Sequence, residues 1–289
     1  MVPTCANPSG KTMSLGRRQG LVKLARAHDA LIICDDVYDF LQWPLDGDPS
    51  PDRAPEMRLP RLCDIDLAMG PADNDGQCFG HAVSNGSFSK IAGPGVRTGW
   101  VEAAPAFVAG LGYTASTVSG GAPSQLCAAM LGDMVQSGEL EKHIETQVRP
   151  SLRRRHRLMM DAVRQFLAPL GVETRQSSLA DGSRVYGGYF VWLVPSPDRA
   201  FPARAVAALA LEEENLILSH GGMFEVHGDE DAARFDTEIR LCFAWESEEN
   251  LIEGVQRLGR LLRRLQDNRD HYRARFENSP ESGFVNASK

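Results

Sequence analysis

The sequence lacks the features that mark a membrane protein or a nucleic-acid binder. No apolar run reaches the length of about 18 residues that a membrane-spanning helix needs, and no signal peptide precedes the first predicted element. Positive charge is also scarce, because 31 lysines and arginines face 38 aspartates and glutamates, for a net charge of −7. Binding to nucleic acid needs a basic surface for the phosphates. We therefore expect neither a membrane nor a nucleic acid as partner, and we expect a cytosolic protein.

Closely spaced cysteine pairs are missing as well. The six cysteines are scattered from Cys5 to Cys242, and no two of them form a C-x-x-C pair. This pattern excludes a zinc framework and predicts reduced, mostly buried thiols of an intracellular protein. Cys34 and Cys242 lie in apolar runs typical of strands, so we expect both to be buried. No metal is predicted.

The size and composition are those of an ordinary globular protein. The chain has 289 residues, of which 43% are hydrophobic and 24% charged. This length exceeds the usual single domain of about 100–200 residues, so we expect two domains. The predicted domains are 1–140 and 141–268, joined by a long helix, and a polar tail at 269–289.

The first third predicts an α/β fold with a mainly parallel sheet. Apolar residues at helical spacing follow Ser14, a possible helix cap, and continue to about His28. The continuous apolar run 30–34 then predicts a strand buried on both faces. A helix followed by such a strand is the repeat of a parallel α/β sheet.

Two polar side chains follow this strand at the edge where open α/β sheets bind ligands. Asp35 and Tyr38 lie three residues apart. The carboxylate could keep a pyridine nitrogen protonated while the phenol donates a hydrogen bond to a neighbouring ring oxygen. The acidic cluster could equally bind a divalent cation or lie in solvent as a helix cap.

The middle of the chain predicts a long loop and then helices. Residues 42–80 are rich in proline, glycine and aspartate, which indicates a functional loop or an insertion. Helices are predicted at 105–111 and 125–135, followed by one long helix over 140–166 that is interrupted at Pro150. The basic run 153–157 on that helix is predicted to be a solvated face.

The last third predicts a smaller α/β domain. We expect strands at 186–193, 216–218 and 238–243, and helices at 203–211 and 247–265. Arg240 lies in the last of these strands as a single cation among apolar residues. Because an unpaired buried charge is costly, it needs an anion. That anion is either a local glutamate or the carboxylate of a substrate.

The segment around Lys90 has the composition of a cofactor site. Lys90 follows an apolar run, is preceded by Ser87 and Ser89, and is followed seven residues later by Arg97. An amine attacks an aldehyde only in its neutral form, which desolvation or a nearby cation favours. The two hydroxyls and the guanidinium could bind a phosphate. These residues suit a Schiff base with pyridoxal phosphate (PLP), although a surface lysine after a strand is the simpler interpretation.

Two other motifs are incomplete. Ser87-x-x-Lys90 matches the serine nucleophile motif of penicillin-binding proteins, but its Ser-Asp-Asn and Lys-Thr-Gly partners do not occur. Gly10-Lys11-Thr12 suggests a phosphate-binding P-loop, but Cys5 stands where that loop requires glycine. Asn7, in an Asn-Pro-Ser-Gly stretch, is by itself a typical turn former.

Taken together, the order and spacing of these motifs resemble the class I/II aminotransferases of PLP fold type I. The resemblance covers residues 1–265. Within that family the chain looks most like the fungal 2-aminoadipate and aromatic aminotransferases and the aminotransferase-like domains of MocR regulators. Its motifs are the Asn7 stretch, Asp35-x-x-Tyr38, the Ser87 to Arg97 segment, the Gly187-Gly188 strand and Arg240.

The resemblance implies a role for each of these residues. Lys90 would carry PLP, Asp35 would pair with the pyridine nitrogen, and Tyr38 and Asn7 would bind the 3-oxygen. Phosphate would be held by Ser87, Ser89 and Arg97, and the substrate carboxylate by Arg240. The implied reaction moves an amino group between an amino acid and a 2-oxo acid, in a protein that is a homodimer when full length.

One departure from the family leaves alternatives open. In that family a small-residue phosphate loop and an aromatic residue that stacks on the cofactor lie upstream of the Asn-Pro motif, which here begins at residue 7. We therefore expect a chain without its N-terminal part, either a truncated enzyme or an inactive remnant that serves as a binding protein. A third possibility is a PLP lyase or decarboxylase, since the same lysine and aspartate serve those reactions.

Overall fold

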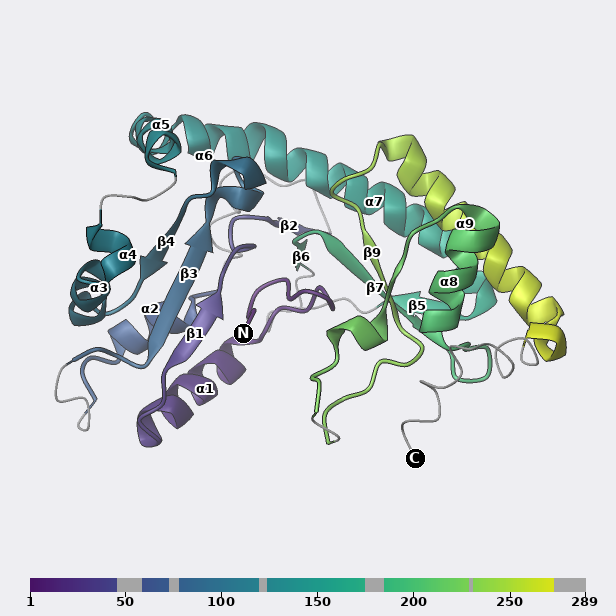
Figure 1. The fold of residues 1–289 in the computed structure, drawn as a ribbon, viewed down its shortest axis with the longest axis horizontal. Coiled ribbons are helices and arrows are strands. Elements are labelled where there is room, and N and C mark those ends of the chain that lie inside the picture. Colours follow the sequence, from purple (N-terminus) through teal and green to yellow (C-terminus); the bar gives the residue numbers. More distant parts are fainter. Residues whose placement is uncertain (46–58, 73–77, 120–123, 175–184, 229–230, 273–289) are drawn as a thin grey trace. The chain divides into compact units, whose positions relative to one another are not determined.

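The computed structural model describes residues 1–45, 59–72, 78–119, 124–174, 185–228 and 231–272 (Figure 1). The chain divides into two compact units. Unit 1 comprises Met1–Arg153 and Gln176–Gly188, and unit 2 comprises Arg154–Arg175 and Tyr189–Lys289. The boundary between the units at residues 153 and 154 therefore lies within one helix, α7 (Arg149–Phe166). The domain boundary predicted at residue 140 stays a prediction. No helix in the described part of the chain is long and apolar enough to cross a membrane.

Unit 1 is built on a three-stranded sheet. Its order is β1 (Ile32–Asp35), β3 (Ala82–Ser87) and β4 (Gly99–Glu102). The first two strands are parallel, and β4 runs antiparallel to β3. A separate antiparallel ribbon pairs β2 (Gln42–Pro44) with β6 (Val185–Gly187). Carboxyl ends of the parallel pair therefore lie at one edge of the sheet, where the predicted site residues follow.

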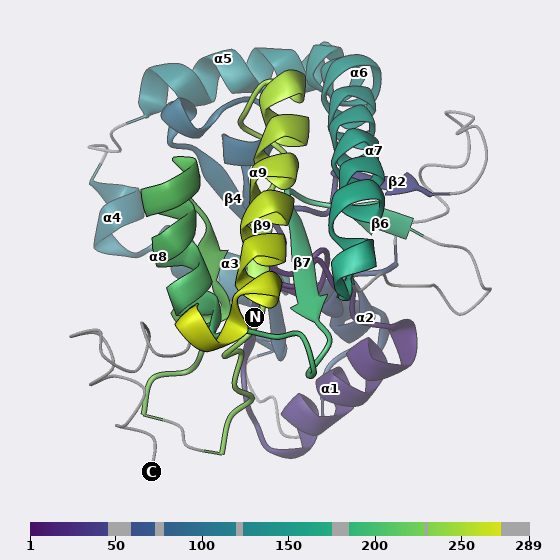
Figure 2. The ribbon, with the colours of Figure 1, turned by 90° about the vertical axis from the view of Figure 1, so that its right-hand side faces the viewer.

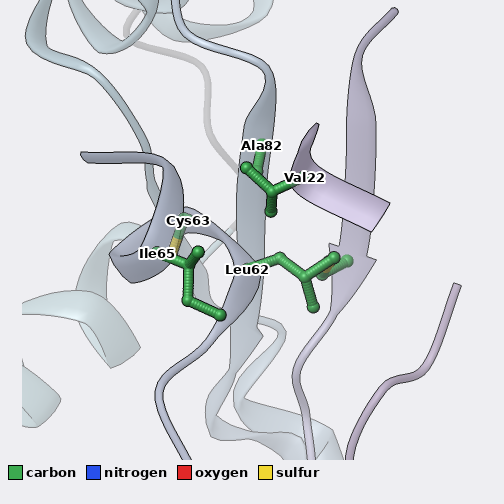
Figure 3. Packing of buried hydrophobic residues seen from close by; sticks show 6 residues of the cluster. Val22, Leu62, Cys63, Ile65 and Ala82 are labelled. Atoms are coloured by element: carbon green, nitrogen blue, oxygen red, sulfur yellow. The ribbon is translucent and has the colours of Figure 1, made fainter. Parts of the chain in front are cut away.

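Two helices cover one face of this sheet. They are α1 (Leu15–Ala27), as predicted, and α2 (Leu62–Ala68), which lies inside the stretch that we expected to be loop. The core between them consists of Val22, Cys34, Leu62, Cys63, Ile65 and Ala82 (Figure 3). Arg26 joins the helices through an ion pair with Asp66, at 2.7 Å. The predicted loop 42–80 is thus in part a strand and a core helix, and its residues 46–58 and 73–77 lie outside the described residues.

The first strand is not buried on both faces, contrary to our expectation. Ile33 is 59% exposed and Leu31 46% exposed, whereas Cys34 is fully buried against the helices. β1 forms an edge of the described sheet, and alternate residues along a strand face opposite sides. The continuous apolar run 30–34 therefore did not show whether this strand is covered on two faces or on one.

Short helices complete unit 1. They are α3 (Pro105–Gly112), α4 (Ala115–Val118), α5 (Gln125–Gln136) and α6 (Glu139–His143). A π-helical turn, Ile144–Val148, joins α6 to α7 (Arg149–Phe166), so the predicted long helix exists. The interruption lies just before Pro150, because proline has no N–H to continue the regular hydrogen-bond ladder.

Unit 2 is an antiparallel sheet with helices. Its strand order is β5 (Val172–Thr174), β7 (Phe190–Pro195), β9 (Ile239–Cys242) and β8 (Ser219–His220). Helices α8 (Ala203–Glu214) and α9 (Glu248–Asp267) lie side by side (Figure 2) and are tied by ion pairs from Glu214 to Arg260 and Arg264. Gly259 lets α9 approach the end of α7, because a Cβ there would lie 3.1 Å from the Phe166 carbonyl oxygen.

Four details of unit 2 and its entry differ from prediction. The strand expected at 186–193 is two strands, β6 and β7, because Gly188 adopts a positive φ of 70° between them. The strand expected at 216–218 lies instead at β8. Cys242 is exposed. In the basic run, Arg155 is not a solvated side chain, since it donates to the carbonyl oxygens of Phe243 and Glu246.

Two other predictions are confirmed in unit 2. Ser247 caps α9, its Oγ accepting from the Asn250 N–H at 3.2 Å. The helix then presents an apolar stripe that includes Leu251, Val255 and Leu258, all buried. Of the polar tail, residues 273–289 lie outside the described residues.

Candidate functional site

The parallel pairing of β1 and β3 brings two predicted site residues to one edge of the sheet. Asp35 is the last residue of β1 and pairs with Asn85 of β3 in register. The Asn85 side-chain amide also lies 3.4 Å from Asp35 Oδ1. Three residues after β3 ends, the chain reaches Lys90. Asp35 and Lys90 thus follow the carboxyl ends of neighbouring parallel strands, the location at which open α/β sheets bind ligands.

A short 3₁₀ turn, Phe88–Lys90, presents the lysine. Ser87 caps the turn, with its Oγ accepting from the Ser89 N–H at 3.1 Å. Phe88 packs edge-on against Trp100 of β4, with ring centroids 4.8 Å apart. The two serines and the lysine are all half-buried, so the structure keeps them together on one turn anchored by an aromatic contact.

A second cluster gathers three more of the predicted motifs. Tyr38 is buried, at 4% exposure, and a Cβ on Gly188 would lie 3.6 Å from its ring. Cys5 of the N-terminal loop packs against the same glycine, two residues before Asn7. The Asn7-Pro8 peptide is cis. The N-terminal loop, Tyr38 and the glycine pair therefore meet within unit 1.

Arg97, the third predicted phosphate ligand, lies at the surface of unit 1. It is exposed, lies in the left-handed backbone region with φ 47°, and its guanidinium donates to the carbonyl oxygen of Pro94 at 3.0 Å. Its own carbonyl accepts from Ser124 Oγ at 2.7 Å. The Arg97 carbonyl is thus held by Ser124, and the Arg97 guanidinium is bonded to the turn that precedes it.

Arg240 lies in β9 of unit 2 between two aromatic rings. The guanidinium carbon is 4.1 Å from the centre of the Phe190 ring and 4.6 Å from that of Phe224. One terminal nitrogen donates to Ser219 Oγ at 3.1 Å. The two ring contacts and the hydrogen bond to Ser219 restrict how far the guanidinium can turn.

Sequence analysis did not identify the residues that hold this arginine. Phe190 is the diagonal cross-strand neighbour of Arg240, because Trp192 stands directly opposite on β7. Phe224 ends the 3₁₀ helix Gly221–Phe224, which follows β8, and packs on Trp192 with ring centroids 5.9 Å apart. The spacing of Phe190 and Trp192 was a usable signal, but the placement of Phe224 required the fold.

Sequence analysis also did not predict the acidic cavity that unit 1 contains. Asp36 and Asp39 follow β1, and Arg61, Asp64, Trp100 and Glu102 contribute to the lining. Burial raises the pKa of Asp36, and it raises the pKa of Asp39 to about 7, to which the charge of Asp36 adds. From this stretch of sequence only Asp35 and Tyr38 had been given roles in the cofactor site, and the acidic cluster had been left open as a divalent-cation site or a helix cap.

The chain belongs to the class I and II aminotransferase family, whose model matches residues 1–258. It is 37% identical over 230 residues to an uncharacterized protein of Saccharomyces cerevisiae, covering 79% of this chain and 48% of that one. It is 28% identical to aromatic-amino-acid aminotransferase 1 of Thermococcus litoralis, covering 91% of this chain and 53% of that one. The chain thus spans about half the length of the curated relatives that it matches.

A solved structure confirms the fold class. The α-aminoadipate aminotransferase of Thermus thermophilus, complexed with N-(5'-phosphopyridoxyl)-L-leucine, matches with a TM-score of 0.66 and 25% identity. The match covers 92% of this chain and 58% of that one. The α/β class and fold type I inferred from the motifs are confirmed, as is the family.

The residues present fit a PLP group at the edge of the sheet in unit 1. An acid and a lysine follow adjacent parallel strands, and two serine hydroxyls lie on the lysine's own turn. Among the three predicted phosphate ligands, Arg97 is exposed, and its guanidinium donates to the Pro94 carbonyl oxygen of its own turn. The donor set therefore provides partners for a pyridine nitrogen, an aldehyde and part of a phosphate.

Proposed function

We propose that this chain carries the lysine-bearing part of a PLP-dependent aminotransferase site. The reaction would move an amino group between an amino acid and a 2-oxo acid. The observation that supports this most strongly is the parallel pairing of β1 and β3, which brings Asp35 and Lys90 to one edge. Family membership across residues 1–258 supports the same conclusion.

Each site residue has a proposed part. Lys90 would bind the cofactor covalently through Nζ, and Asp35 would hold a proton on the pyridine nitrogen. Tyr38 and Asn7 would donate to the ring oxygen, and Ser87, Ser89 and Arg97 would bind the phosphate. Bound PLP supplies a ring that accepts the charge left when a proton leaves the substrate's α-carbon.

The protein's own groups would then do the acid–base work. The freed Lys90 amine would remove the α-proton and return it elsewhere on the substrate, as a general base and acid. Arg240 would bind the α-carboxylate with its planar fork of donors. We further propose a homodimer for the full-length protein and a cytosolic location.

The test is binding of PLP to the 289-residue chain. We expect an absorbance band of bound PLP, fixed to a Lys90 peptide by borohydride and identified by mass spectrometry. Lys90→Ala should remove both the band and the labelled peptide. Lys23→Ala, an exposed lysine on α1, is the matched control and should keep both. Labelling of another lysine would contradict the proposal.

Two alternatives have their own outcomes. If the chain binds no PLP even when PLP is supplied in excess, that result would support the alternative of an inactive remnant that acts as a binding protein. A chain that binds PLP through Lys90 but releases ammonia or carbon dioxide, and forms no new amino acid from a 2-oxo acid, would be a lyase or decarboxylase.

A further inference from the structure

Unit 1 contains an acidic cavity of about 360 Å³ that the proposed function does not use. Four segments line it: the residues after β1, the residues leading into α2, and the strands β3 and β4. Neither Lys90 nor Asp35 is among its lining residues. The cavity is therefore defined by side chains other than the predicted cofactor ligands, although it shares the strand β3 with them.

Four carboxylates and one guanidinium line this cavity. The guanidinium of Arg61 donates to both oxygens of Asp64, each at 3.0 Å, and to both oxygens of Glu102, each at 2.7 Å. The pKa of Asp64 and that of Glu102 are lowered, with the hydrogen bonds from Arg61 outweighing burial. Arg61 is thus fully engaged with two of the four acids.

The other two carboxylates are less well satisfied. Asp36 is 4% exposed, and its Oδ2 accepts from Ser84 Oγ at 2.6 Å. Among the described residues, neither its Oδ1 nor Oδ1 of Asp39 has a hydrogen-bond partner, and both atoms are buried. An acceptor left in this state destabilises the fold unless a donor reaches it.

The nearest other cation in this region is already engaged. Arg18 is buried at 1% exposure and donates to the carbonyl oxygens of Pro3, Met13 and Pro60 and to the Thr4 hydroxyl. Its charge favours the ionised forms of both aspartates, but its hydrogen bonds go to these four oxygens. Two guanidinium groups, Arg18 and Arg61, therefore face four carboxylates, so the region has an excess of negative charge when all four carboxylates are ionised.

Aromatic rings form part of the lining. Phe40 and Trp100 both contribute, and the Trp100 indole lies directly on Gly86, where a Cβ would come within 2.1 Å of the ring. The indole N–H donates to Glu102 Oε1 at 2.8 Å. The ring is thus held in place, and the face of a fixed indole attracts cations.

We propose that this cavity binds an organic cation, an ammonium or guanidinium group on a short aliphatic chain, through Asp36 and Asp39. Such a group brings N–H donors to two unpartnered acceptors, offsets the excess charge, and places its methylenes against the rings. A metal ion fits less well, because the described residues contain no group of three or more His, Cys, Asp or Glu side chains that could hold one.

Binding should depend on pH in a defined direction. The groups that act on Asp39 are the carboxylate of Asp36, the guanidinium groups of Arg18 and Arg61, and the hydroxyl of Thr4. Burial raises the pKa of Asp39 to about 7, so below that pH a bound cation must displace a proton. Affinity should therefore rise by up to about tenfold per pH unit below pH 7 and level off above it.

The test titrates the 289-residue chain with n-butylamine and methylguanidine by calorimetry at about pH 6 and about pH 8. The expected result is saturable binding of both cations, tighter at the higher pH, with n-butanol as the neutral comparison. Asp39→Asn and Asp36→Asn should each weaken binding about tenfold or more. Asp133→Asn, an exposed aspartate on α5, should leave it unchanged.

Three results would overturn the proposal. They are affinity for the cations no greater than for n-butanol, equal affinity in the wild type and Asp39→Asn, and affinity that falls as pH rises. If Asp36→Asn does not fold, Asp39→Asn and the pH series still decide the question. Because PLP is absent from this titration, the outcome does not depend on the proposed function.

Discussion

Arg18 and Arg61 in unit 1 are held differently from Arg240 and His156 in unit 2. In unit 1, guanidinium groups lie in hydrogen-bond networks: Arg18 bonds to four oxygens, and Arg61 to two carboxylates. In unit 2, ionisable side chains lie against aromatic rings: Arg240 between Phe190 and Phe224, and His156 with Phe243 at 5.3 Å. Networks of the first kind join segments far apart in sequence, whereas aromatic contacts act on the π-face of a group and restrict its orientation.

This difference separates charges that hold the fold from charges suited to binding. A guanidinium enclosed by carbonyl oxygens is a structural crosslink, and its removal leaves several buried acceptors without a donor. A guanidinium stacked between rings is oriented mainly by its faces, so its removal should affect a ligand more than the fold. The predictions below test this contrast, beginning with the largest expected effect.

Arg18→Met should destabilise unit 1 most. The change roughly keeps the volume of the side chain but removes the guanidinium donor of the Met13 and Pro60 carbonyl oxygens and of the Thr4 hydroxyl, whereas the Pro3 oxygen still accepts from the Met13 N–H. We expect the free energy of unfolding to fall by about 3–5 kcal/mol, measured by urea denaturation. Arg17→Met, at the exposed neighbouring position, should change it by less than about 0.5 kcal/mol. Equal effects of the two variants would contradict the crosslink role.

His156 should make unit 2 sensitive to acid. Burial lowers its pKa from 6.5 to about 3, so the unfolded chain binds its proton first as pH falls. The stability that His156 contributes is present above about pH 6.5 and is lost progressively toward pH 3, by up to about 1.4 kcal/mol per pH unit. Urea unfolding of His156→Gln should therefore show a shallower loss than the wild type between these pH values.

The variant His28→Gln, at an exposed position, serves as the control, and the pH dependence of its stability should match that of the wild type.

The ionisation of Asp39 in unit 1 should change stability with pH in the opposite direction to that of His156. Its folded pKa of about 7 lies above the usual 3.8, so its contribution is present below pH 3.8 and is lost as pH rises toward 7. An Asp39→Asn variant should therefore gain stability relative to the wild type as pH increases.

Arg240→Ala should affect substrate more than stability. Under the proposed function, loss of charge-assisted bonds to a carboxylate, about 2–3 kcal/mol, predicts that kcat/KM for an amino acid falls about 30–160-fold. The matching amine without a carboxylate should be unaffected. Phe224→Leu, which removes one stacking face, should give a smaller loss of about fivefold. Arg263→Ala, exposed on α9, is the control. An equal loss of kcat/KM for the amino acid and for the amine without a carboxylate would show that Arg240 does not bind the carboxylate.

Arg97→Ala should have the smallest effect. The side chain is exposed and donates to a carbonyl of its own turn, so the free energy of unfolding should change by less than about 0.5 kcal/mol. If Arg97 binds phosphate, the Kd for PLP, measured by absorbance, should rise about fivefold. Lys142→Ala, on the exposed surface of α6, should leave this Kd unchanged.

Much of the fold followed from local sequence patterns. Helical spacing predicted α1, α5 and α9, and the cap at Ser247, because these depend on neighbours within a few turns. The helix α2 was missed because seven residues between prolines carry too little periodicity to stand out from a loop. The break at Gly188 was missed because an apolar run continues across it, and only the positive φ separates the two strands.

The site was predictable where chemistry and spacing coincide in one segment. Ser87, Ser89 and Lys90 form one turn, and Asp35 ends the neighbouring strand, so order along the chain indicated their placement. The clamp on Arg240 was not predictable, because Phe224 reaches it from the 3₁₀ helix after β8, whose conformation depends on the whole of unit 2. The acidic cavity combines four segments, and its unpartnered oxygens are properties of packing that no single segment encodes.

Trp100 and Phe40 line two cavities in unit 1, the acidic one and an apolar one of about 460 Å³ bordered by Phe88, Ile91 and Leu140. The same two rings therefore set the dimensions of both spaces. A side chain at position 86 would displace the indole, which lines both spaces, so a single methyl group added there should alter two sites together. The fluorescence of this indole would report on either one.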